Sequence, residues 1–76
     1  MKPVNIGFGN YIISERVAGV ISPDSAPLKR LIQDARDKGA VVDATFGRRT
    51  RAIIFLDSGH TVLSALTPDT IAGRLE

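Results

Sequence analysis

The feature that most constrains the fold is the run Ala52–Leu56, which is apolar at every position. Because successive side chains of a strand point to opposite faces, such a run predicts a strand that is buried on both sides. The chain has 76 residues and no cysteine, so disulfides and thiolate metal sites cannot stabilise a small core. Both faces of this strand therefore need apolar cover, from the same chain or from another subunit.

Turn formers and alternating apolar residues predict the remaining strands. Gly7, Gly9 and Asn10 indicate a turn at 7–10 that follows a short strand and precedes more extended chain. The predicted strands are 4–6, 17–22, 41–45, 51–56 and 61–66. We expect the last three to form an antiparallel meander, so that residues 47–51 lie at a hairpin tip.

One amphipathic helix is predicted at about 25–38, from the apolar stripe Leu28, Leu31, Ile32 and Ala35. Ser25 is its expected N-cap, Pro27 lies in the first turn, and Gly39 is the expected stop.

A short C-terminal helix is expected at about 68–75, capped by Thr67. The predicted class is α+β, with one small, mainly antiparallel sheet, a central amphipathic helix and this C-terminal helix, in a single domain that spans residues 1–76.

The predicted layers leave apolar surface to cover. One helix covers only one face of such a sheet, and Ile71 and Leu75 of the terminal helix supply only part of the second layer. A neighbouring subunit is the more generous source of cover. The sequence therefore predicts a homo-oligomer.

Three of the ten basic side chains, Arg48, Arg49 and Arg51, fall within four residues. Arginine suits phosphate because its planar fork gives bidentate hydrogen bonds and keeps its charge. The net charge of +2 is mild for a nucleic-acid binder, and such a cluster is equally consistent with a solvated turn. The local sequence therefore leaves both interpretations open.

Three further cations are candidate associates of this cluster. Arg16 precedes the strand at 17–22, where periodicity alone favours an exposed arginine paired with a carboxylate. Lys29 and Arg30 lie on the polar face of the predicted helix, which is most simply a solvated face. Phe46 lies next to the cluster, but Phe8, Tyr11 and Phe55 are expected in the core, so no stacking platform for single strands is predicted.

The sequence offers little for catalysis or for membrane insertion. His60 is the only histidine, and no serine has a setting that would activate it. We expect no enzyme activity, cofactor, metal or small-molecule substrate. No apolar run approaches the roughly 18 residues of a membrane span, and no signal peptide is visible, so we expect a cytoplasmic protein without membrane contact.

Three blocks of sequence, in order and correctly spaced, resemble the RemA family of bacterial extracellular matrix regulatory proteins. They are NIGFGN at 5–10, SPDSAPLKRLIQDARDKG at 22–39 and DATFGRRTRA at 43–52. The resemblance implies a nucleoid-associated, DNA-binding transcriptional activator of biofilm-matrix genes that forms a ring-shaped homo-oligomer, with an octamer as the expected size.

The resemblance also assigns residues. It implies that Arg16, Arg48 and Arg49 contact duplex DNA and that Pro27 matters for function by fixing the start of the helix. Arg51 is added because it lies close to the pair. The alternatives are a structural oligomer or interaction module that binds acidic partners, and an RNA-binding protein that uses the same arginines.

Overall fold

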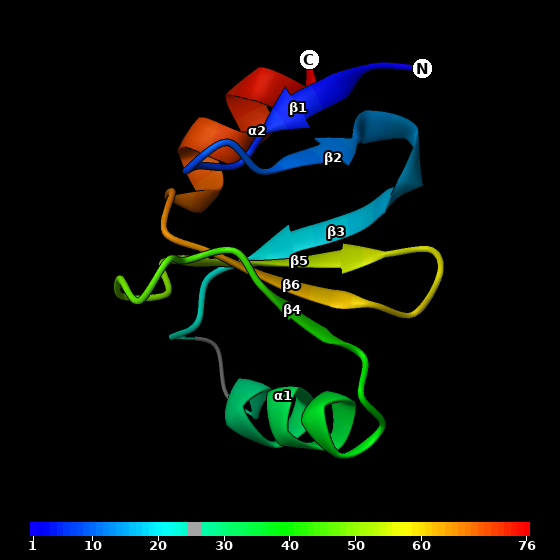
Figure 1. Cartoon of the computed structure of the whole chain (residues 1–76), viewed down its shortest axis with the longest axis vertical. Coiled ribbons are helices and arrows are strands. Elements are labelled where there is room, and N and C mark those ends of the chain that lie inside the picture. Colours follow the sequence, from blue (N-terminus) through cyan, green and yellow to red (C-terminus); the bar gives the residue numbers. More distant parts are fainter. Residues whose placement is uncertain (25–26) are drawn as a thin grey trace.

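The computed structural model describes residues 1–24 and 27–76, which form two sheets and two helices (Figure 1). The four-stranded sheet lies in the middle, with α1 (Leu28–Asp37) on one side. A two-stranded sheet and α2 (Pro68–Leu75) lie on the other side. The expected α+β class is confirmed.

The N-terminal hairpin joins β1 (Pro3–Asn5) to β2 (Tyr11–Ile13), and Val4 faces Ile12 across the antiparallel pair. The predicted turn at 7–10 is confirmed. A 3₁₀ turn at Ser14–Arg16 then leads into the four-stranded sheet.

The four-stranded sheet has the order β3-β5-β6-β4. Its strands are β3 (Val17–Ile21), β4 (Val41–Asp43), β5 (Ala52–Leu56) and β6 (Thr61–Ser64). The predicted meander was wrong, because β4 pairs with β6, and in parallel. The reason is that β3 occupies the other edge of β5, which leaves only the outer edge of β6 for β4. The segment 44–51 therefore crosses the end of β6 and is no hairpin tip.

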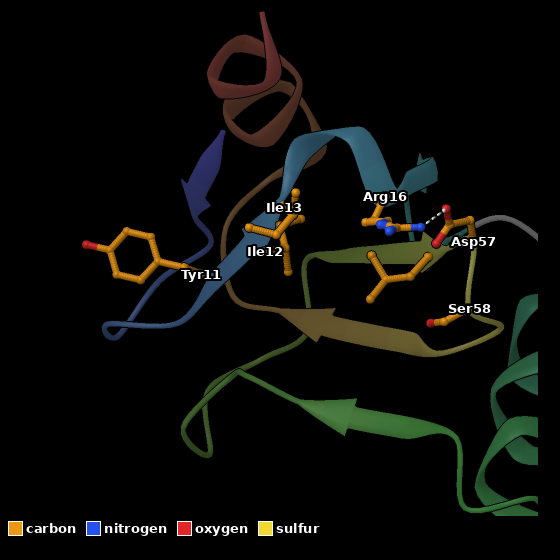
Figure 2. A pocket seen from close by; sticks show the side chains of 7 residues that line it. Tyr11, Ile12, Ile13, Arg16, Asp57 and Ser58 are labelled. Carbon is orange, nitrogen blue, oxygen red and sulfur yellow. Dashed lines mark hydrogen bonds and ion pairs between the residues drawn. The ribbon is translucent and has the colours of Figure 1, made fainter. Parts of the chain in front are cut away.

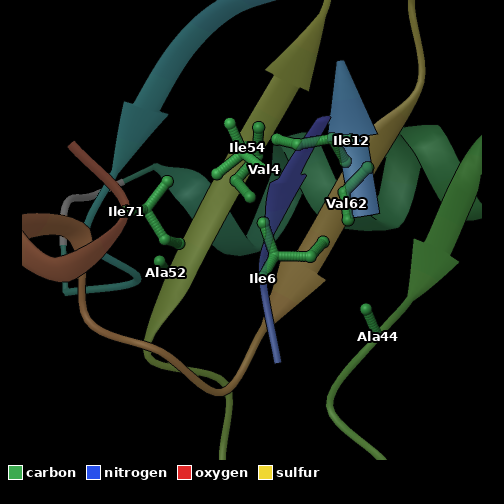
Figure 3. Close-up of a cluster of buried hydrophobic side chains, with 8 residues drawn as sticks. All are labelled: Val4, Ile6, Ile12, Ala44, Ala52, Ile54, Val62 and Ile71. Carbon is green, nitrogen blue, oxygen red and sulfur yellow. The ribbon is translucent and has the colours of Figure 1, made fainter. Parts of the chain in front are cut away.

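Alternate residues of the central strands enter two separate cores. Ile53 of β5 and Leu63 of β6 pack with Leu28 of α1. The opposite faces of these strands enter a larger core under the N-terminal hairpin and α2 (Figure 3). The buried residues of that core are Val4, Ile6, Ile12, Ala44, Ala52, Ile54, Val62 and Ile71.

The chain itself thus covers both faces of its sheet. The prediction of an oligomer rested on an uncovered second face, and that reason was wrong. The N-terminal hairpin and α2 form the second layer. Val4, Ile6 and Ile12 of the hairpin segment all point into the larger core. The oligomer itself stays a prediction and has to rest on other grounds.

The helix ends differ slightly from expectation. α1 begins at Leu28, with Pro27 at its N-cap, so Pro27 does lie at the helix start. Gly39, with φ of 69°, follows the helix as predicted. Leu31 was expected in the apolar stripe but is 48% exposed. The predicted cap at Ser25 lies outside the described residues.

α2 begins as predicted. The Thr67 hydroxyl oxygen accepts a hydrogen bond from the backbone N–H of Thr70 at 3.3 Å, and Pro68 occupies the first turn.

Candidate nucleic-acid interface

Residues 44–51, which we call the arginine loop, are anchored at both ends to the end of β6. The N–H of Ala44 donates to the carbonyl of Leu63 at 2.9 Å, and the N–H of Arg51 donates to the carbonyl of Ser64 at 2.8 Å. Within the loop, the N–H of Arg48 donates to the carbonyl of Thr45 at 2.9 Å. The loop is therefore a braced turn that projects from one end of the sheet (Figure 1).

Asp43 holds the beginning of this loop. One carboxylate oxygen, Oδ1, accepts hydrogen bonds from the Thr45 backbone N–H at 2.9 Å and from the Thr45 hydroxyl at 2.6 Å. These bonds favour the charged form and lower the pKa of Asp43 below its ordinary value. Asp43 therefore has a structural role in this loop.

The three arginines of the loop, Arg48, Arg49 and Arg51, are all exposed. In residues 1–24 and 27–76, the ion pairs are Met1 with Glu15 and Arg16 with Asp57, so no described carboxylate neutralises the loop. The loop thus presents three cations whose hydrogen-bond forks are free to meet an anion.

A pocket of about 310 Å³ opens beside these arginines. We call it the aromatic–arginine pocket. It is lined by Phe8, Arg48, Arg49, Arg51, Ala65 and Leu66. Its lining therefore combines one aromatic residue and three arginines with two apolar residues, Ala65 and Leu66, which we call its floor.

Phe8 and Phe46 are not core residues, contrary to the expectation for Phe8. Their rings stack with centroids 5.4 Å apart and an interplanar angle of 23°, and the side chains are 51% and 80% exposed. The Arg48 guanidinium carbon lies 5.9 Å from the centroid of the Phe8 ring. The expectation that Phe8 lies apart from the arginine cluster was wrong, because residues 38 positions apart in the chain meet at one end of the fold.

The sequence did contain a signal for Phe8. It stands between Gly7 and Gly9, and all three residues have positive φ, which is 54° at Phe8. A phenylalanine in such a turn cannot belong to a buried strand.

Arg16 lies at the opposite end of the sheet from the arginine loop. It precedes Val17, which pairs with Leu56 at the end of β5, whereas Arg51 precedes the beginning of β5. A five-residue strand, about 17 Å long, separates the two positions. Within one chain, the fold therefore does not bring Arg16 to the loop.

The Arg16 side chain forms an exposed ion pair with Asp57 at 3.3 Å (Figure 2). An exposed ion pair contributes little stability in water, so Arg16 can readily leave Asp57 and bind another anion. Neighbouring Glu15 is engaged elsewhere, because its carboxylate accepts from the Ser14 hydroxyl and the Lys2 N–H. Together with the N-terminal ammonium group, these bonds lower the pKa of Glu15 to about 2.

Lys29 and Arg30 are exposed in the first turn of α1. α1 begins at the same end of the sheet as the arginine loop (Figure 1). Neither residue lines the aromatic–arginine pocket. The Pro27 carbonyl accepts the N–H of Arg30 at 3.1 Å, so Pro27 takes part in the helix start that presents both cations.

Other chemistry is sparse in the described part of the chain. Residues 1–24 and 27–76 contain no group of three or more His, Cys, Asp or Glu side chains that could hold a metal ion. His60 is exposed in the turn after β5, with Nδ1 2.8 Å from the Ser58 hydroxyl. Among the described helices, none has the length and apolar character needed to cross a bilayer.

Comparison with known proteins supports the family that the three sequence blocks suggested. A family model described as RemA-like, extracellular matrix regulatory protein A-like, matches residues 4–75. The chain is 60% identical over 76 residues to a putative regulatory protein of Dictyoglomus thermophilum, covering all of this chain and 89% of that protein. It is 57% identical over 75 residues to extracellular matrix regulatory protein A of Bacillus subtilis, covering 99% of this chain and 84% of that protein. The chain therefore belongs to the RemA-like family of regulatory proteins.

Proposed function

We propose that this regulatory protein binds duplex DNA and acts as a transcriptional activator, with the arginine loop as the phosphate-binding element of each subunit. The observation that carries the proposal is the set of three exposed loop arginines, Arg48, Arg49 and Arg51, that no described carboxylate neutralises. A fixed loop orients these forks before binding, which lowers the entropy cost of contacting the DNA backbone. The Bacillus subtilis relative is named extracellular matrix regulatory protein A, which supports matrix genes as the targets of the present protein.

One loop per chain is a small contact for tight binding. We propose that a homo-oligomer, with an octameric ring as its expected form, places several loops on one duplex. A ring uses a head-to-tail interface, in which opposite ends of neighbouring subunits meet. Such an interface offers a way for Arg16 of one subunit to lie near the arginine loop of the next.

Sequence selectivity has to come from another source than phosphate contacts. Phosphate contacts orient a protein on DNA without reading bases, so the shape, bendability and spacing of the sites would select the target. Nucleoid association in the cytoplasm follows from this mode of binding. At the edge of this DNA-binding surface, Lys29 and Arg30 add positive charge. Pro27 acts there by fixing the start of α1.

Removal of two loop cations tests the proposal. We expect Arg48→Ala combined with Arg49→Ala to weaken binding to a duplex promoter fragment by at least tenfold in a gel-shift assay, because two charge-assisted phosphate contacts are lost. The matched control combines Arg36→Ala and Lys38→Ala, which removes two exposed cations from the far end of α1. Equal weakening by both pairs would point to net charge alone and would contradict a specific role of the loop.

The size of each variant is measured in parallel by sedimentation. A wild-type mass equal to one 8.2 kDa chain at micromolar concentration would overturn the oligomer.

A further inference from the structure

The aromatic–arginine pocket has features that contact with duplex phosphates does not use. The DNA backbone meets guanidinium groups, yet this pocket is also lined by Phe8, which stacks on Phe46, and by an apolar floor of Ala65 and Leu66. Phe8 and Phe46 both adopt positive φ, at 54° and 53°, which is unfavourable for a bulky residue. Strained residues that expose an apolar ring beside cations indicate a binding function.

The turn that carries Phe8 is held in place before any ligand arrives. The Gly7 N–H donates to Oδ1 of Asn5 at 2.8 Å, and Nδ2 of Asn10 donates to the Gly7 carbonyl at 2.9 Å. Below it, the buried Ser64 hydroxyl donates to the Ile6 carbonyl at 2.8 Å. The backbone that carries Phe8 is therefore held on the four-stranded sheet, and its ring is stacked on Phe46.

The floor of the pocket is fixed by the same serine. The Leu66 N–H donates to the Ser64 hydroxyl oxygen at 3.1 Å, and the Ser64 carbonyl accepts the N–H of Arg51 at 2.8 Å. The backbone segments that carry Phe8, Leu66 and Arg51 are thus all bonded to the end of β6.

We propose that this pocket binds an unpaired nucleotide, whose base packs against the exposed half of Phe8 that Phe46 leaves open and whose phosphate is held by Arg48, Arg49 and Arg51. Aromatic faces stack on any base, and adjacent arginines hold the phosphate while adding cation–π attraction. The volume of about 310 Å³ lies in the range of ligand pockets.

A smaller hollow of about 160 Å³, which is also lined by Arg49 and Arg51, is less suitable because Asp24 lines it and repels an anion.

The proposal deepens the proposed function, since it assigns a second ligand to the same loop. Two kinds of ligand carry a base with its phosphate: a DNA strand with an unpaired base, and a free nucleotide. Duplex binding through the arginines does not require the Phe8 ring, so the two proposals can be tested separately.

The test compares three probes with the full chain. The first is a short single-stranded DNA that contains the fluorescent base 2-aminopurine, the second is the same strand with abasic sites in place of its bases, and the third is free 2-aminopurine deoxyribonucleoside triphosphate. We expect the strand with bases to bind roughly 5- to 100-fold more tightly than the abasic strand, with quenched fluorescence, because stacking adds to an unchanged phosphate contact. Saturable binding of the free nucleotide as well would assign the site to a small ligand, and binding of the strand alone would assign it to DNA.

Phe8→Leu should remove the preference for bases while it leaves the salt dependence of binding unchanged. Tyr11→Leu is the matched control, because Tyr11 is another exposed aromatic of the same hairpin, 62% against 51% for Phe8, and lines a different hollow (Figure 2). Phe8→Trp, which keeps an aromatic face, should retain the preference and so separates stacking from folding. Circular dichroism verifies the fold of each variant.

Equal affinity for the strands with and without bases would overturn the proposal, and so would a folded Phe8→Leu protein that keeps the preference. If duplex binding persists in either case, the proposed function stands without this inference. Preference for bases in a protein that fails to bind duplex would sustain the inference and reject the proposed function.

Discussion

At the scale of single residues, two polar side chains determine how the arginine loop is held. Asp43 fixes the beginning of the loop through Thr45, and Ser64 lies beneath its end, fully buried, with hydrogen bonds on both sides. Neither residue contacts a phosphate in our account. Both hold the backbone that carries the arginines and Phe8.

The lowered pKa of Asp43 gives a pH-dependent contribution to stability. A carboxylate whose pKa falls on folding stabilises the folded state above its unfolded value, here 3.8, and loses that contribution as the pH falls through the folded value. At neutral pH, Asp43→Asn should lower the free energy of unfolding by about 0.5–1 kcal/mol, because a charge-assisted bond to Thr45 is weakened at an exposed site.

Urea unfolding of both proteins across the acid range measures this difference. It should shrink below pH 3.8 as the wild-type carboxylate becomes protonated. Asp34→Asn, at an exposed position of α1, should stay within about 0.5 kcal/mol of wild type throughout. A difference for Asp43→Asn that is constant over the whole acid range would exclude the proposed bonds.

At the scale of elements, the N-terminal hairpin has two roles. Its apolar side covers the larger core through Val4, Ile6 and Ile12, and its turn presents Phe8 to the pocket. The turn depends on Gly7, whose φ of 108° is one that other residues rarely adopt.

Two glycine substitutions distinguish the effect of the positive φ at Gly7 on stability from the general effect of replacing a glycine. Gly7→Ala should destabilise the fold by about 1–2 kcal/mol, because alanine is strained at this φ. Its Cβ would meet Leu66 at 3.6 Å, which is an ordinary contact, so the backbone conformation alone accounts for the cost. Gly73→Ala, within α2 and with open space around its Cβ, should stabilise by about 0.5–1 kcal/mol.

Thermal unfolding compares the two glycine variants with the wild-type protein. Equal effects of the two substitutions would contradict the conformational role of Gly7.

The sequence predicted individual elements better than their pairing. The continuous apolar run Ala52–Leu56 correctly indicated a strand buried on both faces, and Pro68 correctly marked the start of α2. Strand order was missed, because it depends on which edge β3 occupies, and no local pattern encodes that choice. The meeting of Phe8 with Phe46 was missed for the same reason, since it follows from how the hairpin packs on the sheet.

At the scale of the whole molecule, the sheet has two different ends. The arginine loop, the turn of the N-terminal hairpin and the start of α1 lie at one end, and Arg16 lies at the other, paired with Asp57 (Figures 1 and 2). The chain covers both faces of its own sheet, so the proposed oligomer does not follow from an uncovered core. The proposed binding of one duplex by several arginine loops would depend strongly on ionic strength.

The salt dependence of duplex binding is the sharpest test of the proposed contacts between the arginine loop and DNA phosphates. Each neutralised phosphate contributes about −0.9 to the slope of log affinity against log salt concentration, so several loops with about two phosphates each should give a slope clearly steeper than −2. In the Arg48→Ala and Arg49→Ala double variant, with its oligomer intact, the slope should become markedly shallower. A wild-type affinity that does not fall with salt, or a slope that the double variant leaves unchanged, would contradict the claim that the arginine loop binds DNA phosphates.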